Sequence, residues 1–171
     1  LEGSTSTSPL STNQCVFCPR GRYADTQASP FCKNCDEGKY SSVKGAMSEE
    51  SCEACEEGKY NEVAGADECK VCPPGNYCPL ERNGTVTYKP CAPGTYQDDV
   101  MQTDCKLCPR GKYGNGSMEA ACEYALPGRY CPNIGMTSSL ACPPGSYSSA
   151  NAEICTKCPL GQYQEESGGT K

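Results

Sequence analysis

The chain has 171 residues, a net charge of −6, no histidine and no tryptophan, and 17 of its residues are cysteine. Leu, Ile, Val and Phe together also make up only 17 residues, well below the roughly 20% expected of a domain with an apolar core. Histidine-based catalysis is thereby excluded. The scattered basic residues and the lack of a long apolar run argue against a nucleic-acid partner and against a membrane span in this segment. We therefore predict a non-enzymatic chain held together by disulfides, which form in an oxidising compartment.

Residues 1–14 (LEGSTSTSPLSTNQ) are rich in Ser and Thr and are predicted to form an N-terminal tail or linker. This composition is typical of a flexible segment at the end of a domain. Two alternatives are an O-glycosylated linker and a tail that docks on a neighbouring protomer.

From residue 15 to residue 171 the chain repeats one short phrase, Gly-x-Tyr, set three residues after a cysteine position. The phrase recurs every 16 to 20 residues. Self-similarity at a nearly fixed period indicates small units that bury their inner faces against their neighbours. We predict about nine tandem cysteine-rich repeats, here called repeats 1 to 9, in a segment of a longer array. The phrase tyrosines, in repeat order, are Tyr23, Tyr40, Tyr60, Tyr77, Tyr96, Tyr113, Tyr130, Tyr147 and Tyr163.

Within each repeat the usual pattern is C-x-x-C-P-x-G-x-Y, followed by polar residues that lead to the next cysteine. Pro and Gly favour a tight turn after the second cysteine, and the tyrosine then begins a short strand. Stretches such as residues 41–52 carry a central glycine and return to the next cysteine, which favours a hairpin. The predicted fold class is therefore small, disulfide-rich and mostly β or irregular. It is an elongated array of short stapled β-hairpins with little helix.

The phrase tyrosines have two interpretations. In the first, each ring packs on the adjacent disulfide and on the next repeat, and so replaces the missing aliphatic core. In the second, the rings form an exposed ladder that contacts proteins or sugars.

Two sequons lie in loops rich in turn residues, at Asn83-Gly-Thr85 and Asn115-Gly-Ser117. Asn83 and Asn115 are therefore candidate N-glycosylation sites, because sequons in surface loops of secreted chains are acceptors. Together with the cysteine content they predict an extracellular or cell-surface glycoprotein made in the secretory pathway.

The C-x-x-C pairs also have alternative interpretations. A zinc ribbon uses similar spacing, but several repeats have lost one cysteine of the pair, which would leave a metal site short of ligands. A thiol oxidoreductase needs one such pair at a helix start in a βαβ setting, which this sequence does not offer. Local disulfides within each pair are a structural alternative. We predict no metal and no cofactor.

Adjacent carboxylates such as Asp98-Asp99 are expected to be solvated faces of polar loops. Weak calcium binding is the alternative, although no D-x-D-x-D-G pattern supports it.

Three repeats depart from the cysteine pattern. Tyr88 and Ser139 stand where the first cysteine of the pair is expected, and Ala125 stands where a second cysteine is expected. Repeats 4 and 7 gain a cysteine directly after the phrase tyrosine, at Cys78 and Cys131. The gain of one cysteine thus accompanies the loss of another in the following unit.

The phrases CVFCPRGRY, CKLCPRGKY and CPPGNYCPL resemble the ephrin-receptor-like cysteine-rich repeat (GCC2/GCC3). They are also similar to the first half of the cysteine-rich modules of tumour-necrosis-factor receptors, and the resemblance covers residues 15 to about 163. It implies a rod of stapled hairpins of the kind used in receptors, adhesive proteins and surface coats. It implies the disulfides Cys18–Cys32, Cys35–Cys52, Cys55–Cys69 and Cys108–Cys122. It also implies that Cys15 and Cys158 pair with units outside this segment.

For the variant repeats the resemblance leaves two pairings open, because spacing alone does not give connectivity. The first is Cys72–Cys78, Cys91–Cys105 and Cys142–Cys155, with Cys131 left without a partner. The second is nested: Cys72–Cys105, Cys78–Cys91 and Cys131–Cys142, with Cys155 left without a partner.

These features predict an extracellular structural or adhesive protein, a stretch of a surface coat, filament or stalk. Its partners would be other protein chains, through self-assembly or surface ligands, and N-linked and O-linked glycans. The alternative is a receptor ectodomain that binds a protein ligand along its cysteine-rich rod.

Overall fold

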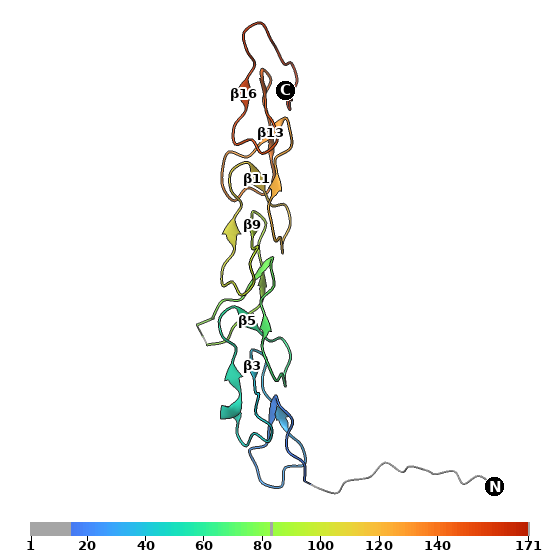
Figure 1. The fold of residues 1–171 in the computed structure, drawn as a ribbon, viewed down its shortest axis with the longest axis vertical. Helices are drawn as coiled ribbons and strands as arrows, with labels where there is room; N and C mark the ends of the chain where they lie inside the picture. The colour runs from blue at the N-terminus through green and yellow to red at the C-terminus, as the bar shows by residue number, and fades with distance from the viewer. Residues whose placement is uncertain (1–14, 83, 171) are drawn as a thin grey trace, which may run out of the picture.

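The computed structural model describes residues 15–82 and 84–170 as a thin rod built from a tandem array of small units (Figure 1). Sixteen two-residue strands and one short 3-10 helix, η1 (Glu49–Ser51), are the regular elements of the described residues. This confirms the predicted fold class of stapled hairpins with little helix. The expectations for residues 1–14 lie outside the described residues.

The strands pair two by two, as eight separate antiparallel hairpins. The pairs are β1 (Arg22–Tyr23) with β2 (Lys33–Asn34), β3 (Lys39–Tyr40) with β4 (Glu53–Ala54), β5 (Lys59–Tyr60) with β6 (Lys70–Val71), β7 (Asn76–Tyr77) with β8 (Lys89–Pro90), β9 (Thr95–Tyr96) with β10 (Lys106–Leu107), β11 (Lys112–Tyr113) with β12 (Glu123–Tyr124), β13 (Arg129–Tyr130) with β14 (Leu140–Ala141), and β15 (Ser146–Tyr147) with β16 (Thr156–Lys157).

The phrase glycine makes the turn that starts each hairpin. In repeat 1 the Arg22 amide donates to the Pro19 carbonyl at 3.3 Å, and Gly21 between them has φ of +77°. A positive φ at the third position is typical of a type II turn, which glycine adopts without steric cost. The same bond between residues three apart recurs in repeats 2 to 7 and 9, for example from Lys112 to Pro109. The turn at the phrase glycine, preceded by Pro-x in about half of the repeats, therefore sets where the strand begins.

Successive repeats are joined by backbone hydrogen bonds that form a ladder along the rod. In the first of these bonds, the amide of the glycine in Gly-x-Tyr donates to a carbonyl of the next repeat, that of the residue directly after its tyrosine. An example is the bond from Gly21 to Ser41 at 2.8 Å. In the second bond, the amide of the turn residue in one repeat's loop donates to the carbonyl of a cysteine in the previous repeat. This cysteine, here called the phrase cysteine, lies three residues before the glycine of Gly-x-Tyr; an example is the bond from Gly45 to Cys18 at 2.8 Å. In the third bond, the amide of the residue after the tyrosine donates to the carbonyl of the residue that follows the loop turn of the next repeat. An example is the bond from Ala24 to Ala46 at 3.0 Å.

Repeats two apart also touch. A Cβ built on Gly58 of repeat 3 would lie 2.4 Å from the Met101 carbonyl oxygen of repeat 5, and one on Gly21 would lie 2.0 Å from the Gly65 oxygen. No side chain fits at such distances, so the phrase glycines permit the close approach of backbones as well as the turn. Repeat 1 and repeats 3 to 7 are thereby each packed closely against the second repeat that follows.

The interior of the rod consists of disulfides and small polar side chains. Apart from cysteines and Tyr23, the buried hydrophobic residues of the described chain are only Ala46, Val86 and Ala125. The residue directly after the phrase tyrosine is buried in most repeats, at Ser41, Asn61, Cys78, Gln97, Gly114, Cys131 and Ser148.

Two polar members of this buried set, Asn61 and Ser148, find partners in the preceding repeat. Asn61 Nδ2 donates to the Lys39 carbonyl at 2.7 Å, and Ser148 Oγ donates to the Arg129 carbonyl at 2.9 Å. Buried polar groups are tolerated when they are hydrogen-bonded in this way. The interior therefore joins neighbouring repeats through specific hydrogen bonds where other proteins use aliphatic contacts.

Candidate functional site

Seven disulfides run along the rod, most of them from the phrase cysteine of one repeat to the first cysteine of the next. They are Cys18–Cys32, Cys35–Cys52, Cys55–Cys69, Cys72–Cys78, Cys91–Cys105, Cys108–Cys122 and Cys142–Cys155. The two cysteines of one C-x-x-C, such as Cys32 and Cys35, go to different bonds, so the alternative of local disulfides within a pair is wrong. In the variant repeats the structure contains the first of the two pairings, in which Cys131 has no partner.

Cys131 therefore needs a correction as a disulfide position. Its thiol is free and buried, because Ala125 occupies the place that Cys72 holds opposite Cys78. Burial raises the pKa of the Cys131 thiol, which lowers its reactivity at neutral pH. Cys15 and Cys158 are the other free cysteines. The hairpin of repeat 7 is held instead by Arg129, whose Nε donates to Ser139 Oγ at 2.8 Å.

The phrase tyrosines pack less deeply than the first interpretation expects. Tyr23 is buried with the Cys35–Cys52 disulfide, and Tyr60 packs against a cluster that includes Cys55 and Cys72. The tyrosines of repeats 2 to 8 are half-buried. Tyr163 is 82% exposed, so the described residues leave its ring largely uncovered and the expectation of packing is corrected there.

The candidate glycosylation sites differ in what the structure describes. Asn115 is exposed in the loop after β11, where a glycan has room. Asn83 lies outside the described residues. Both sites remain predictions.

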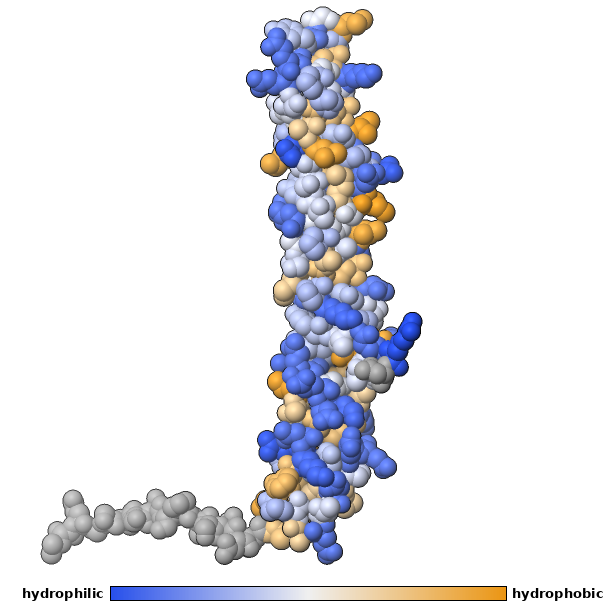
Figure 2. Space-filling view, turned by 180° about the vertical axis from the view of Figure 1, so that it is seen from behind, coloured by the Kyte–Doolittle hydropathy of each residue, from blue (hydrophilic) through white to orange (hydrophobic). Residues whose placement is uncertain are grey.

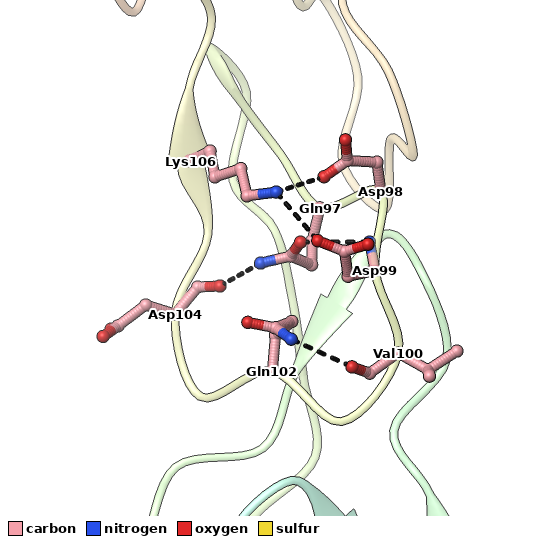
Figure 3. Close-up of polar contacts among 7 residues, drawn as sticks. All are labelled: Gln97, Asp98, Asp99, Val100, Gln102, Asp104 and Lys106. Atoms are coloured by element: carbon pink, nitrogen blue, oxygen red, sulfur yellow. Dashed lines mark hydrogen bonds and ion pairs between the residues drawn. The ribbon is translucent and has the colours of Figure 1, made fainter.

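A lysine of the same hairpin forms ion pairs with both carboxylates of the Asp98-Asp99 pair. Figure 3 shows Lys106 Nζ between the two carboxylates, 3.0 Å from Asp99 Oδ2 and in contact with Asp98. The hydrogen bond from Lys106 lowers the pKa of Asp98 and raises that of Lys106. Gln97 holds the base of the loop by donating to the Asp104 carbonyl at 2.6 Å (Figure 3). These contacts make the pair part of an ion-paired loop.

Charge and hydropathy are distributed unevenly along the rod. Residues 36–68 contain ten acidic and three basic residues, although the whole chain carries a net charge of only −6. Figure 2 shows hydrophilic side chains covering much of the N-terminal half of one face, with hydrophobic side chains projecting nearer the C-terminal end. Exposed apolar or aromatic side chains in the C-terminal half of the chain include Leu107, Tyr124 and Leu140, which belong to successive hairpins. The acidic stretch 36–68 therefore differs in charge from the rest of the rod.

Repeat 4 lacks two of the three ladder bonds to repeat 3. Every other repeat from 2 to 9 places a left-handed turn residue against the preceding repeat, but the described residues of this loop, 79–82 and 84–88, form a separate arrangement with an antiparallel bridge between Leu80 and Val86. In the described residues, the Cys55 carbonyl and the Asn61 amide consequently lack the ladder bonds that their equivalents make.

An open groove of about 510 Å³ lies where the turn of repeat 4 would have packed. We call it the repeat-4 groove; its lining includes Glu37, Gly38, Tyr60, Asn61, Glu62 and Tyr88. The rings of Tyr60 and Tyr88 lie 4.6 Å apart between centroids. Sequence reasoning missed this groove, and the sequence gives no plain signal of it, because the loop of repeat 4 contains a glycine, Gly84, as several other loops do.

Neither a metal centre nor a transmembrane helix is visible in the described part of the chain. Within residues 15–82 and 84–170, no group of three or more Cys, Asp or Glu residues is arranged to hold a metal ion. No helix in the same ranges is long and apolar enough to cross a membrane.

These features define a disulfide-stapled, cysteine-rich repeat rod. A comparison with protein families matches the one described as tyrosine-protein kinase ephrin type A/B receptor-like, at residues 3–52 and 80–120. The match covers more than half of the chain, so the chain belongs to this family of cysteine-rich repeats. Comparison with curated proteins gives no match. The family is a non-catalytic structural module, and with the disulfides it indicates an extracellular protein-interaction role.

Proposed function

We propose that this chain is a stiff extracellular spacer with adhesive surfaces, a stretch of a surface coat, filament or stalk. The observation that carries the proposal is the combination of seven disulfides with a backbone ladder that joins most consecutive repeats. Repeat rods of this kind present long surfaces and set distances between other parts of an assembly. In this role the chain does no chemistry, and its partners are protein chains and attached glycans.

The mechanism of such a spacer is mechanical. A disulfide that closes a 14-residue loop, such as Cys18–Cys32, removes roughly 50 Å of chain from the length available on stretching. The ladder bonds between repeats must break before the remaining chain extends. Force therefore lengthens the oxidised rod only a little, and proteases meet few unfolded segments.

Single-molecule stretching tests the mechanical role. We expect short extensions for the oxidised chain and a much longer contour length after reduction. Equal lengths in the two states would contradict the proposal. Labelling of intact cells that produce the protein, with an antibody that does not enter them, tests the surface location; staining that requires permeabilised cells would refute it.

A receptor ectodomain is the second candidate, and one observation favours it. Leu107, Tyr124 and Leu140 are 53%, 56% and 43% exposed in three successive hairpins, which is the kind of surface that protein ligands bury. Sedimentation velocity over a wide concentration range separates the candidates. Self-association that L107S, Y124S and L140S together abolish favours the coat or filament, whereas a chain that stays monomeric favours the receptor.

A further inference from the structure

The repeat-4 groove exists because one structural element is missing from an otherwise regular array. In repeats 3 and 5, on either side of repeat 4, the turn amides of Gly65 and Met101 donate to the carbonyls of Cys35 and Cys72 at 2.7 and 2.9 Å. The corresponding acceptor facing repeat 4 is the Cys55 carbonyl, and no described residue donates to it. The amide of Asn61, whose equivalent Ser41 donates to Ala66 at 3.1 Å, likewise has no ladder acceptor.

The packing in front of Gly38 is looser for the same reason. A Cβ on Gly38 would meet its nearest atom, Thr85 Cβ, at 3.7 Å, whereas a Cβ on Gly58 would meet the Met101 oxygen at 2.4 Å. Gly38 and Asn61 both line the groove. The groove therefore lies about where the missing turn would pack. Its lining includes Gly38 and Asn61, whose equivalents in other repeats contact a turn.

The walls of the groove are aromatic and acidic. Val86 is buried beneath it against Cys55, Cys72 and Cys78, which fixes the loop of repeat 4 in place. Tyr60 and Tyr88 stand together above this cluster. Burial raises the pKa of Tyr88, so its ring stays neutral at physiological pH.

The acidic residues that line the groove favour an occupant with a positive charge. Glu37 and Glu62 line it, and neither forms an ion pair with any described residue. Both lie in the acidic stretch 36–68, whose summed field attracts cations. Carboxylates beside tyrosine rings suit an ammonium or guanidinium group, and this chain already pairs Lys112 Nζ with the Tyr124 ring at 4.4 Å.

We propose that the repeat-4 groove binds a turn of a partner protein that carries a lysine or arginine. The turn backbone supplies the hydrogen bond missing at Asn61, which lines the groove, and its cation lies between Glu37, Glu62 and the two tyrosines. The proposal rests on the proposed function as an extracellular protein-contact rod, and names the partner chemistry of one of its surfaces.

The test uses the full oxidised chain and a synthetic peptide of residues 41–48 (SSVKGAMS), acetylated and amidated at its ends. This peptide contains Lys44-Gly45, the turn that packs in repeat 2 at the position that repeat 4 lacks. Binding is followed through amide chemical shifts of the isotope-labelled chain. We expect saturable shifts at Gly38 and Asn61, and a loss of binding when Lys44 of the peptide is replaced by Glu.

Charge variants of the chain decide whether the groove is responsible. The double variant E37Q/E62Q should weaken binding roughly three- to tenfold, as expected for two exposed charge contacts. The matched control E53Q/E57Q removes the same charge from exposed positions outside the groove lining and should change affinity less than about twofold, a small loss of long-range attraction.

Three results would overturn the proposal: no saturable shifts, equal binding of the Lys44→Glu peptide, or equal losses in the two double variants. None of these results would alter the stretching behaviour or the surface labelling. The experiments therefore distinguish failure of the proposal that the groove binds a turn from failure of the proposal that the chain is an extracellular spacer.

Discussion

Replacing the phrase glycines by alanine tests whether contact between repeats two apart stabilises the rod. Gly38 and Gly58 form a matched pair, because each has φ of +77° and each amide donates to the following repeat, to Asn61 at 2.9 Å and to Cys78 at 3.1 Å. The cost of a left-handed alanine, about 1–2 kcal/mol, is therefore common to both variants. The effect on the entropy of the unfolded chain is also common and cancels in the comparison.

The variants differ in what the new methyl group meets. In G58A it would lie 2.4 Å from the Met101 oxygen and 2.8 Å from the Met101 carbonyl carbon, so the backbone of repeat 5 must move. In G38A the nearest atom is at 3.7 Å, an ordinary contact. Forcing an extra methyl into a packed site costs about 1–3 kcal/mol. We expect G38A to lose about 1–2 kcal/mol and G58A about 2–5 kcal/mol.

Denaturant unfolding with the disulfides intact measures this difference, and hydrogen exchange locates it. The Met101 amide, which donates to Cys72 at 2.9 Å, should exchange faster in G58A and remain unchanged in G38A. If the two variants lost equal stability, or if G38A were the worse, the close approach of repeats 3 and 5 would not contribute to stability.

Three further predictions concern the cysteines and the ion-paired loop. The variant A125C should form a disulfide with Cys131, six residues away like Cys78 from Cys72, and gain about 2 kcal/mol from the closed loop. Thiol titration of the denatured monomer should then find two free thiols where the parent chain has three, and four would show that the bond does not form. Reduction should unfold the hairpins while a metal chelator leaves them intact, as circular dichroism would report; the reverse pattern would indicate metal thiolates. Lys106 lowers the pKa of Asp98 below its ordinary value of 3.8, so this pair stabilises the folded state at higher pH and the effect is lost as pH falls through the lowered pKa. In K106A the Asp98 carboxyl titration followed by NMR should move up towards 3.8, and an unchanged midpoint would exclude the ion pair.

The repeat architecture was predictable because its causes are local in the sequence. Pro-x-Gly sets a turn within a few residues, and the tyrosine strand follows it, as at Gly21 and Tyr23. The shortage of aliphatic residues left disulfides as the means of holding such turns together. Period, hairpins and the family itself follow from this reasoning.

The interior and the groove depend instead on how each unit rotates against the next. That rotation buries the residue after the tyrosine, such as Ser41 or Gln97, and leaves the tyrosine ring itself half-buried. It brings repeats two apart into close contact at Gly58 and Met101 while leaving looser packing at Gly38. These distances cannot be derived from the spacing of residues along the sequence. The sequence alone therefore determined that cysteines and glycine turns build a rod, whereas the tertiary structure decided which surfaces the rod buries and where it leaves one unfilled.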